Sequence, residues 1–109
     1  MAASKSYRDY VLEELGKVTA VRARAMFGGY GIYAHDAMFA LISSEDVLYL
    51  KIDDASRPQY EAAEMPQFHK MPYFQLPIEV LEDDEQLEEW VKTAVDIAIR
   101  TKKPKKKKK

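Results

Sequence analysis

The sequence predicts a domain of the α+β class, an antiparallel β-sheet packed with N-terminal, short middle and C-terminal helices. The sheet is expected to be a meander of about four to five strands. Two observations carry this prediction. Short apolar or alternating runs, separated by glycines and polar breaks, fill residues 18–52 and are typical of strands with short connections. Apolar residues recur at helical spacing near both ends of the chain, over residues 7–15 and 87–98.

The first helix is expected to begin near Ser6, a candidate N-cap, and to end at Gly16. Residues 18–27 then alternate loosely between apolar and basic side chains, which predicts a strand leading into the glycines. The apolar stripe of this first helix consists of Tyr7, Val11, Leu12 and Leu15.

Three glycines, Gly28, Gly29 and Gly31, are predicted to form a structural turn or bulge at the entry to the next strand. Glycine adopts φ > 0 without the penalty that a Cβ brings. A ligand cradle is the less favoured alternative, because the G-G-x-G spacing differs from that of a dinucleotide fingerprint and a strand follows it.

Three strands are expected after the glycines, over residues 30–34, 38–42 and 47–52. The dipeptide His35-Asp36 has the length of a hairpin loop. In the third strand, the alternation predicts that Leu48, Leu50 and Ile52 share one face and that Val47, Tyr49 and Lys51 share the other.

The second half of the chain is predicted to hold two helices and one edge strand. The segment 53–56 offers N-caps for a short middle helix, whose Tyr60 and Ala63 would face the core. Prolines flank residues 73–76, which limits them to an edge strand. Asp83, with Gln86 three residues later, opens the final helix. Its buried stripe comprises Leu87, Trp90, Val91, Ala94 and Ala98, widened by Val95 and Ile97.

Charge is segregated along the chain. The formal net charge is −1, but the residues before Thr101 hold 10 basic and 18 acidic side chains, a charge of −8. We therefore expect a domain over residues 1–100 and a disordered Lys-rich tail over residues 101–109. An acidic domain repels phosphate, so weak, sequence-independent contact with nucleic acid is assigned to the tail, with a solubilising end as the alternative. The lysines of the tail are Lys102, Lys103, Lys105, Lys106, Lys107, Lys108 and Lys109.

Composition excludes several function classes. No apolar stretch reaches the roughly 20 residues of a membrane helix, so no membrane partner is predicted. The chain has no cysteine, which excludes disulfides and thiolate chemistry, and a cytoplasmic location is the expectation. His35 and His69 lack the spacing of a metal site. The carboxylates of residues 82–89 crowd one helix start, where capping explains them. We predict no catalytic residue, no cofactor and no metal.

Packing in the core is the favoured interpretation for the tyrosines. Those left exposed beside other aromatic and methionine side chains are the candidates for a surface of protein contacts, since both residue types are enriched at interface centres. The candidate interaction patch comprises Tyr49, Lys51, Met71, Tyr73 and Phe74.

The segment MFGGYGIY, followed by MFAL, LYLKID and MPYFQLP, resembles the N-terminal domain of the TfoX (Sxy) competence regulators. The resemblance runs from about residue 21 to the last helix, and the chain is expected to be this domain standing alone, without the C-terminal domain of the full-length regulators. It implies a regulator of competence genes that works with the cyclic-AMP receptor protein.

Two hypotheses for function follow. The first is a non-enzymatic regulator or accessory of transcription that acts through protein contacts; the partner is a protein of the transcription machinery, and a homodimer stays open. The second is a small-molecule-binding or enzymatic domain that uses the sheet face of Lys51 and Tyr49 together with the glycine turn.

Overall fold

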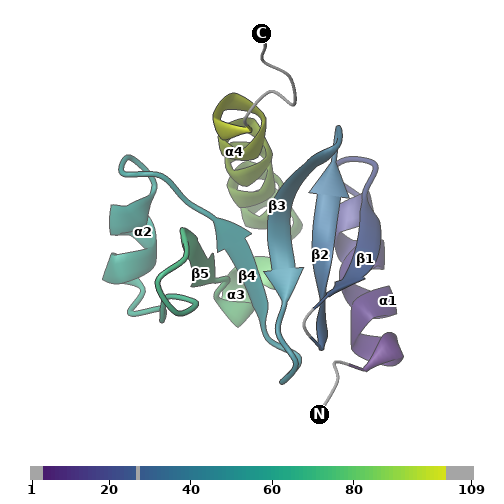
Figure 1. Ribbon diagram of the computed structural model, residues 1–109. Coiled ribbons are helices and arrows are strands. Elements are labelled where there is room, and N and C mark those ends of the chain that lie inside the picture. Colours follow the sequence, from purple (N-terminus) through teal and green to yellow (C-terminus); the bar gives the residue numbers. More distant parts are fainter. Residues whose placement is uncertain (1–3, 27, 103–109) are drawn as a thin grey trace, which may run out of the picture.

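A computed structural model describes residues 4–26 and 28–102 and shows the expected α+β architecture (Figure 1). Within these residues the chain forms five strands and four helices. In chain order they are α1 (Lys5–Gly16), β1 (Arg22–Met26), β2 (Gly29–Ala34), β3 (Ala37–Ile42), β4 (Leu48–Lys51), α2 (Arg57–Ala62), β5 (Tyr73–Gln75), α3 (Ile78–Leu81) and α4 (Asp84–Thr101).

The sheet is a meander in which every strand pairs with its neighbour in sequence. The spatial order is β1-β2-β3-β4-β5, and all four pairings are antiparallel. The predicted fold class is therefore confirmed, including the edge position of β5. The β2–β3 hairpin turns at His35 and Asp36, whose φ angles of 52° and 63° suit the tight turns that join twisted strands.

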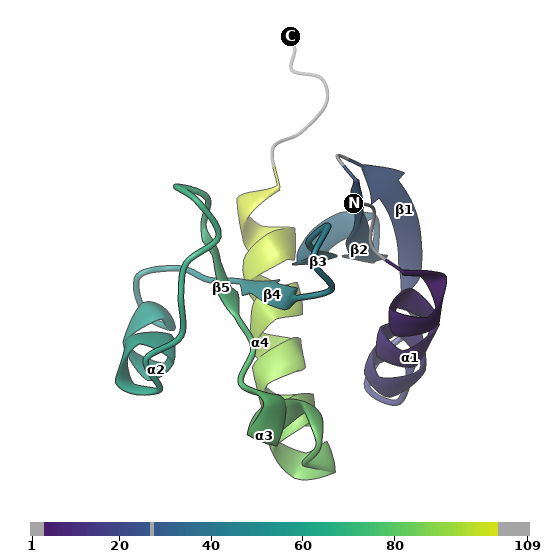
Figure 2. The same cartoon turned by 90° about the horizontal axis from the view of Figure 1, so that it is seen from below.

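The helices gather on one side of the sheet. Figure 2 shows α1, α2 and α3 on the same side, and α4 packs against β3 and β4. A row of apolar side chains crosses all five strands on this side and is part of the core. This row consists of Ala23, Ile32, Ala40, Leu50 and Phe74. The other side of the sheet has no helix over it among the described residues.

The starts of the two long helices are fixed by polar side chains. The cap of α1 is Ser4, whose hydroxyl accepts the N–H of Tyr7 at 3.1 Å, so the prediction of Ser6 was wrong by about half a turn. Asp83 caps α4 as predicted, accepting the N–H groups of Glu85 and Gln86 at 3.1 and 3.2 Å. Gln86 returns a side-chain hydrogen bond to Asp83 at 3.0 Å.

Three details of the core differ from the prediction. Tyr60 is buried as expected, but Ala63 lies beyond the end of α2 and is exposed. Trp90 is half-buried, with its ring against that of Tyr60 at 4.8 Å between centroids. The short helix α3 was not predicted, because four residues between Pro77 and Glu82 are too few to show a helical period.

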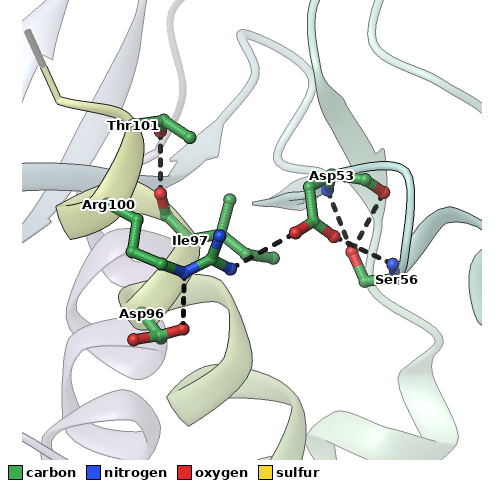
Figure 3. Close-up of polar contacts among 6 residues, drawn as sticks. All are labelled: Asp53, Ser56, Asp96, Ile97, Arg100 and Thr101. Atoms are coloured by element: carbon green, nitrogen blue, oxygen red, sulfur yellow. Dashed lines mark hydrogen bonds and ion pairs between the residues drawn. The ribbon is translucent and has the colours of Figure 1, made fainter.

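The C-terminal end of α4 is tied to the loop after β4 (Figure 3). Arg100 donates to Asp96 at 2.9 Å and to Asp53 at 3.3 Å. The Asp53 carboxylate also accepts the N–H of Ser56 at 2.9 Å. These hydrogen bonds, first that from Ser56 and then that from Arg100, lower the pKa of Asp53. The contacts hold the last turn of α4 beside the sheet.

Candidate functional site

The side of the sheet that faces away from the helices is here called the open face. Charged, polar and aromatic side chains from several strands lie together on it. Strand alternation places one row across all five strands, made of Arg24, Gly31, Leu41, Tyr49 and Gln75. A second row joins Arg22, Tyr33 and Met38, and the pair Lys51 and Tyr73 lies on the same face. Two hollows occur on this face, and Met38 lines both of them.

The first, called the apolar hollow, has a volume of about 830 Å³. One wall is the segment that precedes β5, which folds back through hydrogen bonds from Phe68 N–H to Tyr73 O at 2.8 Å and from Gln75 N–H to Pro66 O at 3.0 Å. This fold places the ring of Phe68 against that of Tyr49, with 4.9 Å between centroids. The lining includes Met26, Met38, Leu41, Tyr49, Phe68 and Met71.

Of the three glycines, Gly29 lines the apolar hollow. Gly28 has φ = 78°, in the region that favours glycine. A Cβ on Gly29 would overlap the backbone of Ile42 in the next strand. A Cβ on Gly31 would meet the sulfur atoms of Met38 and Met26, at 2.7 and 3.0 Å. The structural role assigned to the three residues stays a prediction, and this geometry sets its test.

The second, called the basic hollow, has a volume of about 590 Å³ and lies where α4 ends beside the sheet. The guanidinium of Arg22 lies 5.2 Å from the ring centre of Tyr33, and the Lys51 ammonium 5.3 Å from that of Tyr73. Cations at this distance are attracted by the ring quadrupole. The lining includes Arg22, Arg24, Tyr33, Asp36, Lys51, Tyr73, Thr101 and Lys102.

Burial changes the proton affinity of two groups in the basic hollow. It lowers the pKa of Lys51, because the ammonium loses water. Burial also raises the pKa of Tyr73 to about 12, with a smaller contribution from the neighbouring Tyr33. The Tyr73 hydroxyl donates to the carbonyl of Met38 at 3.3 Å. Tyr73 is therefore a neutral hydrogen-bond donor at physiological pH.

The structure divides the candidate interaction patch. Tyr49 and Met71 line the apolar hollow, whereas Lys51 and Tyr73 line the basic hollow. Phe74 joins neither, because adjacent strand residues point to opposite faces and its ring is buried in the core, 5.9 Å from that of Tyr60.

Sequence reasoning missed other members of the site, chiefly Phe68 and Met38. Arg22 and Arg24 alternate with alanines in the sequence, and this alternation places both on one face. Phe68 belongs to an irregular segment, for which local pattern gives no direction.

The remaining predictions concern the two histidines and the tail. His35 is exposed in the β2–β3 turn, whereas His69 is exposed beside Phe68 and lines the apolar hollow. Across residues 4–26 and 28–102, no group of three or more acidic or histidine side chains has the arrangement of a metal site. Of the predicted tail, only Thr101 and Lys102 are described, and Thr101 still belongs to α4. The helices of the described part are all too short or too polar to cross a membrane.

Comparison with protein families gives a match over most of the chain. The model of the TfoX N-terminal domain family matches residues 13–98. No curated protein matches the chain. The matched range contains the whole sheet, and therefore nearly all of the residues that line the two hollows.

Proposed function

We propose that this chain, which belongs to the TfoX N-terminal domain family, is a non-enzymatic regulator or accessory of transcription that acts in the cytoplasm by binding a protein. The observation that carries the proposal is the apolar hollow on the open face. Methionine and aromatic side chains of this kind concentrate at the centres of protein interfaces.

The composition of the hollow favours an apolar segment of a partner protein. Tyr49, Phe68 and Met38 are half-buried, and 42% of Met71 is exposed, so their apolar atoms are accessible. Glu45, Gln67 and His69 provide polar groups among the lining residues. An apolar centre beside polar side chains is the usual anatomy of a protein contact.

An affinity experiment with matched variants tests the proposal. Met71→Asp places a charge in the apolar hollow, and Ile78→Asp is the control, since Ile78 is 57% exposed on α3, away from the open face. Proteins retained from a cell extract by the unchanged chain should be retained by Ile78→Asp, be lost with Met71→Asp, and include a component of the transcription machinery. Retention of the same proteins by both variants would contradict the proposal. The molar mass in solution tests whether the partner is a second copy of the chain.

A small-molecule-binding or enzymatic domain remains the second candidate, because Lys51 lines the basic hollow and has a lowered pKa. Tyr49 lies in the other hollow, so this candidate depends on Lys51 and Tyr73. A metabolite that raises the melting temperature of the unchanged chain, and has no effect on Lys51→Gln, would support it.

The proposal also includes weak, sequence-independent contact of the lysine tail with nucleic acid. It rests on composition alone, since the residues after Lys102 lie outside the described part of the chain. Removing the tail should weaken such contact and reduce its dependence on salt.

A further inference from the structure

The basic hollow gathers cations that are far apart in the sequence. Arg22 and Arg24 come from β1, Lys51 from β4 and Lys102 from the residue after α4. Asp36 is the only acidic side chain among the described residues that line the hollow. Four cationic side chains therefore face one carboxylate in a domain whose formal charge is strongly negative.

The negative charge lies mainly on the other side of the sheet. Helices α1, α3 and α4, together with the two residues between α3 and α4, carry 11 of the 18 acidic side chains, and these helices cover the face opposite to the two hollows. The sheet thus separates an acidic surface from a basic one. The net charge of the domain consequently does not exclude a polyanion from the open face.

Two of the cations are available for a ligand. Arg22 is bound to Asp36 at 2.7 Å, and Lys102 donates to the carbonyl of Asp36. Within residues 4–26 and 28–102, neither Arg24 nor Lys51 forms an ion pair with a carboxylate. Arg24 is exposed, and the ammonium of Lys51 reaches the hollow beside Tyr73.

The spacing of these cations favours a long anion over a compact one. Strands β1 and β4 are three places apart in the sheet, a separation of about 14 Å at the usual strand spacing. Cations on strands so far apart match the successive phosphates of a chain better than a single phosphate group. The C-terminal end of α4, whose free carbonyl groups repel anions, also lies in the hollow and disfavours a small anion centred there.

Half-buried aromatic rings lie beside the cations on the open face. In the basic hollow, the ring of Tyr33 lies next to Arg22. The rings of Tyr49 and Phe68 lie in the adjoining apolar hollow, and Met38 lines both hollows. Nucleic-acid bases stack on such rings when they are unpaired, and a groove of cations beside the rings binds the backbone. A duplex keeps its bases stacked inside the helix, so it cannot use the rings.

We propose that the open face binds single-stranded nucleic acid, with backbone phosphates at Arg24 and Lys51 and with bases against Tyr33 and Tyr49. The site is part of the folded domain and is distinct from the lysine tail. Lys102 lies at its edge, so a strand bound on the sheet can continue toward the lysines that follow in the sequence.

Two double variants of the full chain with equal net charge test the site. Arg24→Gln with Lys51→Gln removes two cations from the open face. Lys17→Gln with Lys92→Gln removes two exposed cations, one at the C-cap of α1 and one on α4. The probe is a fluorescent single strand of about 12 nucleotides, within the range that single-strand-binding folds occupy. Its affinity is measured at several salt concentrations, beside a duplex and a polyglutamate peptide of similar length. Thermal melting confirms that each variant is folded, and Arg24→Gln alone serves if the double variant is not.

We expect the open-face variant to bind the single strand at least about fivefold more weakly, and its salt slope to fall by about 1.4, or 0.7 for each lost phosphate contact. The control should change the affinity by less than about twofold, with an unchanged slope. Equal losses in the two variants would overturn the proposal. Binding of the duplex as tight as that of the single strand would also overturn the proposal, in favour of the tail. Equally tight binding of polyglutamate would overturn it in favour of an acidic protein as the partner.

Photocrosslinking gives an independent readout. An oligonucleotide with 5-bromodeoxyuridine should attach to the tryptic peptide 25–51, which contains Tyr33 and Tyr49. Attachment confined to the tail would overturn the folded site while leaving the tail contact and the protein-binding function standing.

Discussion

The two faces of the sheet differ in what covers them. On the helix side, the row from Ala23 to Phe74 is packed under α1 and α4, and Ile32, Ala40 and Leu50 have no exposed surface. On the open face, the neighbouring row has the exposed Arg24 at one end and includes the half-buried Tyr49. Each strand contributes adjacent residues to the two rows. The buried core and the candidate binding surface therefore occupy alternate positions of the same strands.

The sharpest test compares two phenylalanines. Phe39 has no exposed surface and belongs to the core, so Phe39→Ala should lower the free energy of unfolding by about 3–5 kcal/mol. Phe68 is half-buried on the open face, and Phe68→Ala should cost less than about 1.5 kcal/mol. Urea denaturation measures both values. Similar losses would mean that the open face is a second core.

The glycines test the comparison at closer range. A Cβ on Gly29 meets the backbone of Ile42, which cannot move alone, so Gly29→Ala should cost about 2–3 kcal/mol. A Cβ on Gly31 meets two flexible methionine side chains, so Gly31→Ala should cost less than about 1 kcal/mol. The melting temperature of Gly29→Ala should therefore be lower than that of Gly31→Ala, and the reverse order would contradict this account.

A smaller effect concerns the tie between α4 and the loop after β4. The pKa of Asp53 is lowered in the fold, so its stabilising contribution is present above the ordinary value of 3.8 and is lost as the pH falls through the folded value. Asp53→Ala should lower the melting temperature by about 2–4 °C at neutral pH, since the contact is partly exposed. The deficit should shrink near pH 3. The neighbouring exposed residue gives the control, Asp54→Ala, which should show no such dependence on pH.

The smallest effect is expected at Lys51. Burial lowers its pKa, so the unfolded chain binds the proton more readily and this group favours folding more as the pH rises toward its ordinary value of 10.5. Lys51→Met removes the cost of burying an ammonium and should leave the free energy of unfolding within about 0.5 kcal/mol of the unchanged chain. A large loss would show that Lys51 supports the fold, and would weaken its assignment to a binding site.

The sequence predicted the sheet because its signals are local. Alternation in residues 47–52 placed Leu48 and Leu50 on the buried face and Tyr49 and Lys51 on the other. The predicted cap of α4 was also local, since Asp83 contacts residues two and three positions ahead. In the first helix, two serines compete as caps within one turn, and the apolar period does not separate them.

The candidate site was less predictable because it depends on contacts between distant segments. Strand register brings Arg24 into one row with Leu41 and Tyr49, residues that local pattern treats separately. Pairing with β4 puts Tyr73 beside Lys51 and Phe74 beside the buried Leu50, so it decides which of these two neighbours, combined in the candidate patch, faces the core. The wall that carries Phe68 is held by hydrogen bonds to β5, and the sequence of this irregular segment has no periodicity that predicts them.

The connectivity of the meander has a consequence for how fast the chain folds. Each strand pairs with the one beside it in sequence, so the first three pairings close only short loops, and the pairing of β4 with β5 closes the longer segment 52–72. Low sequence separation between contacting residues is associated with rapid folding. The contacts between elements far apart in the sequence are those of α4 with β3 and β4. Sheet pairing should therefore proceed stepwise and quickly, and docking of α4 on the central strands should be the event that makes unfolding cooperative.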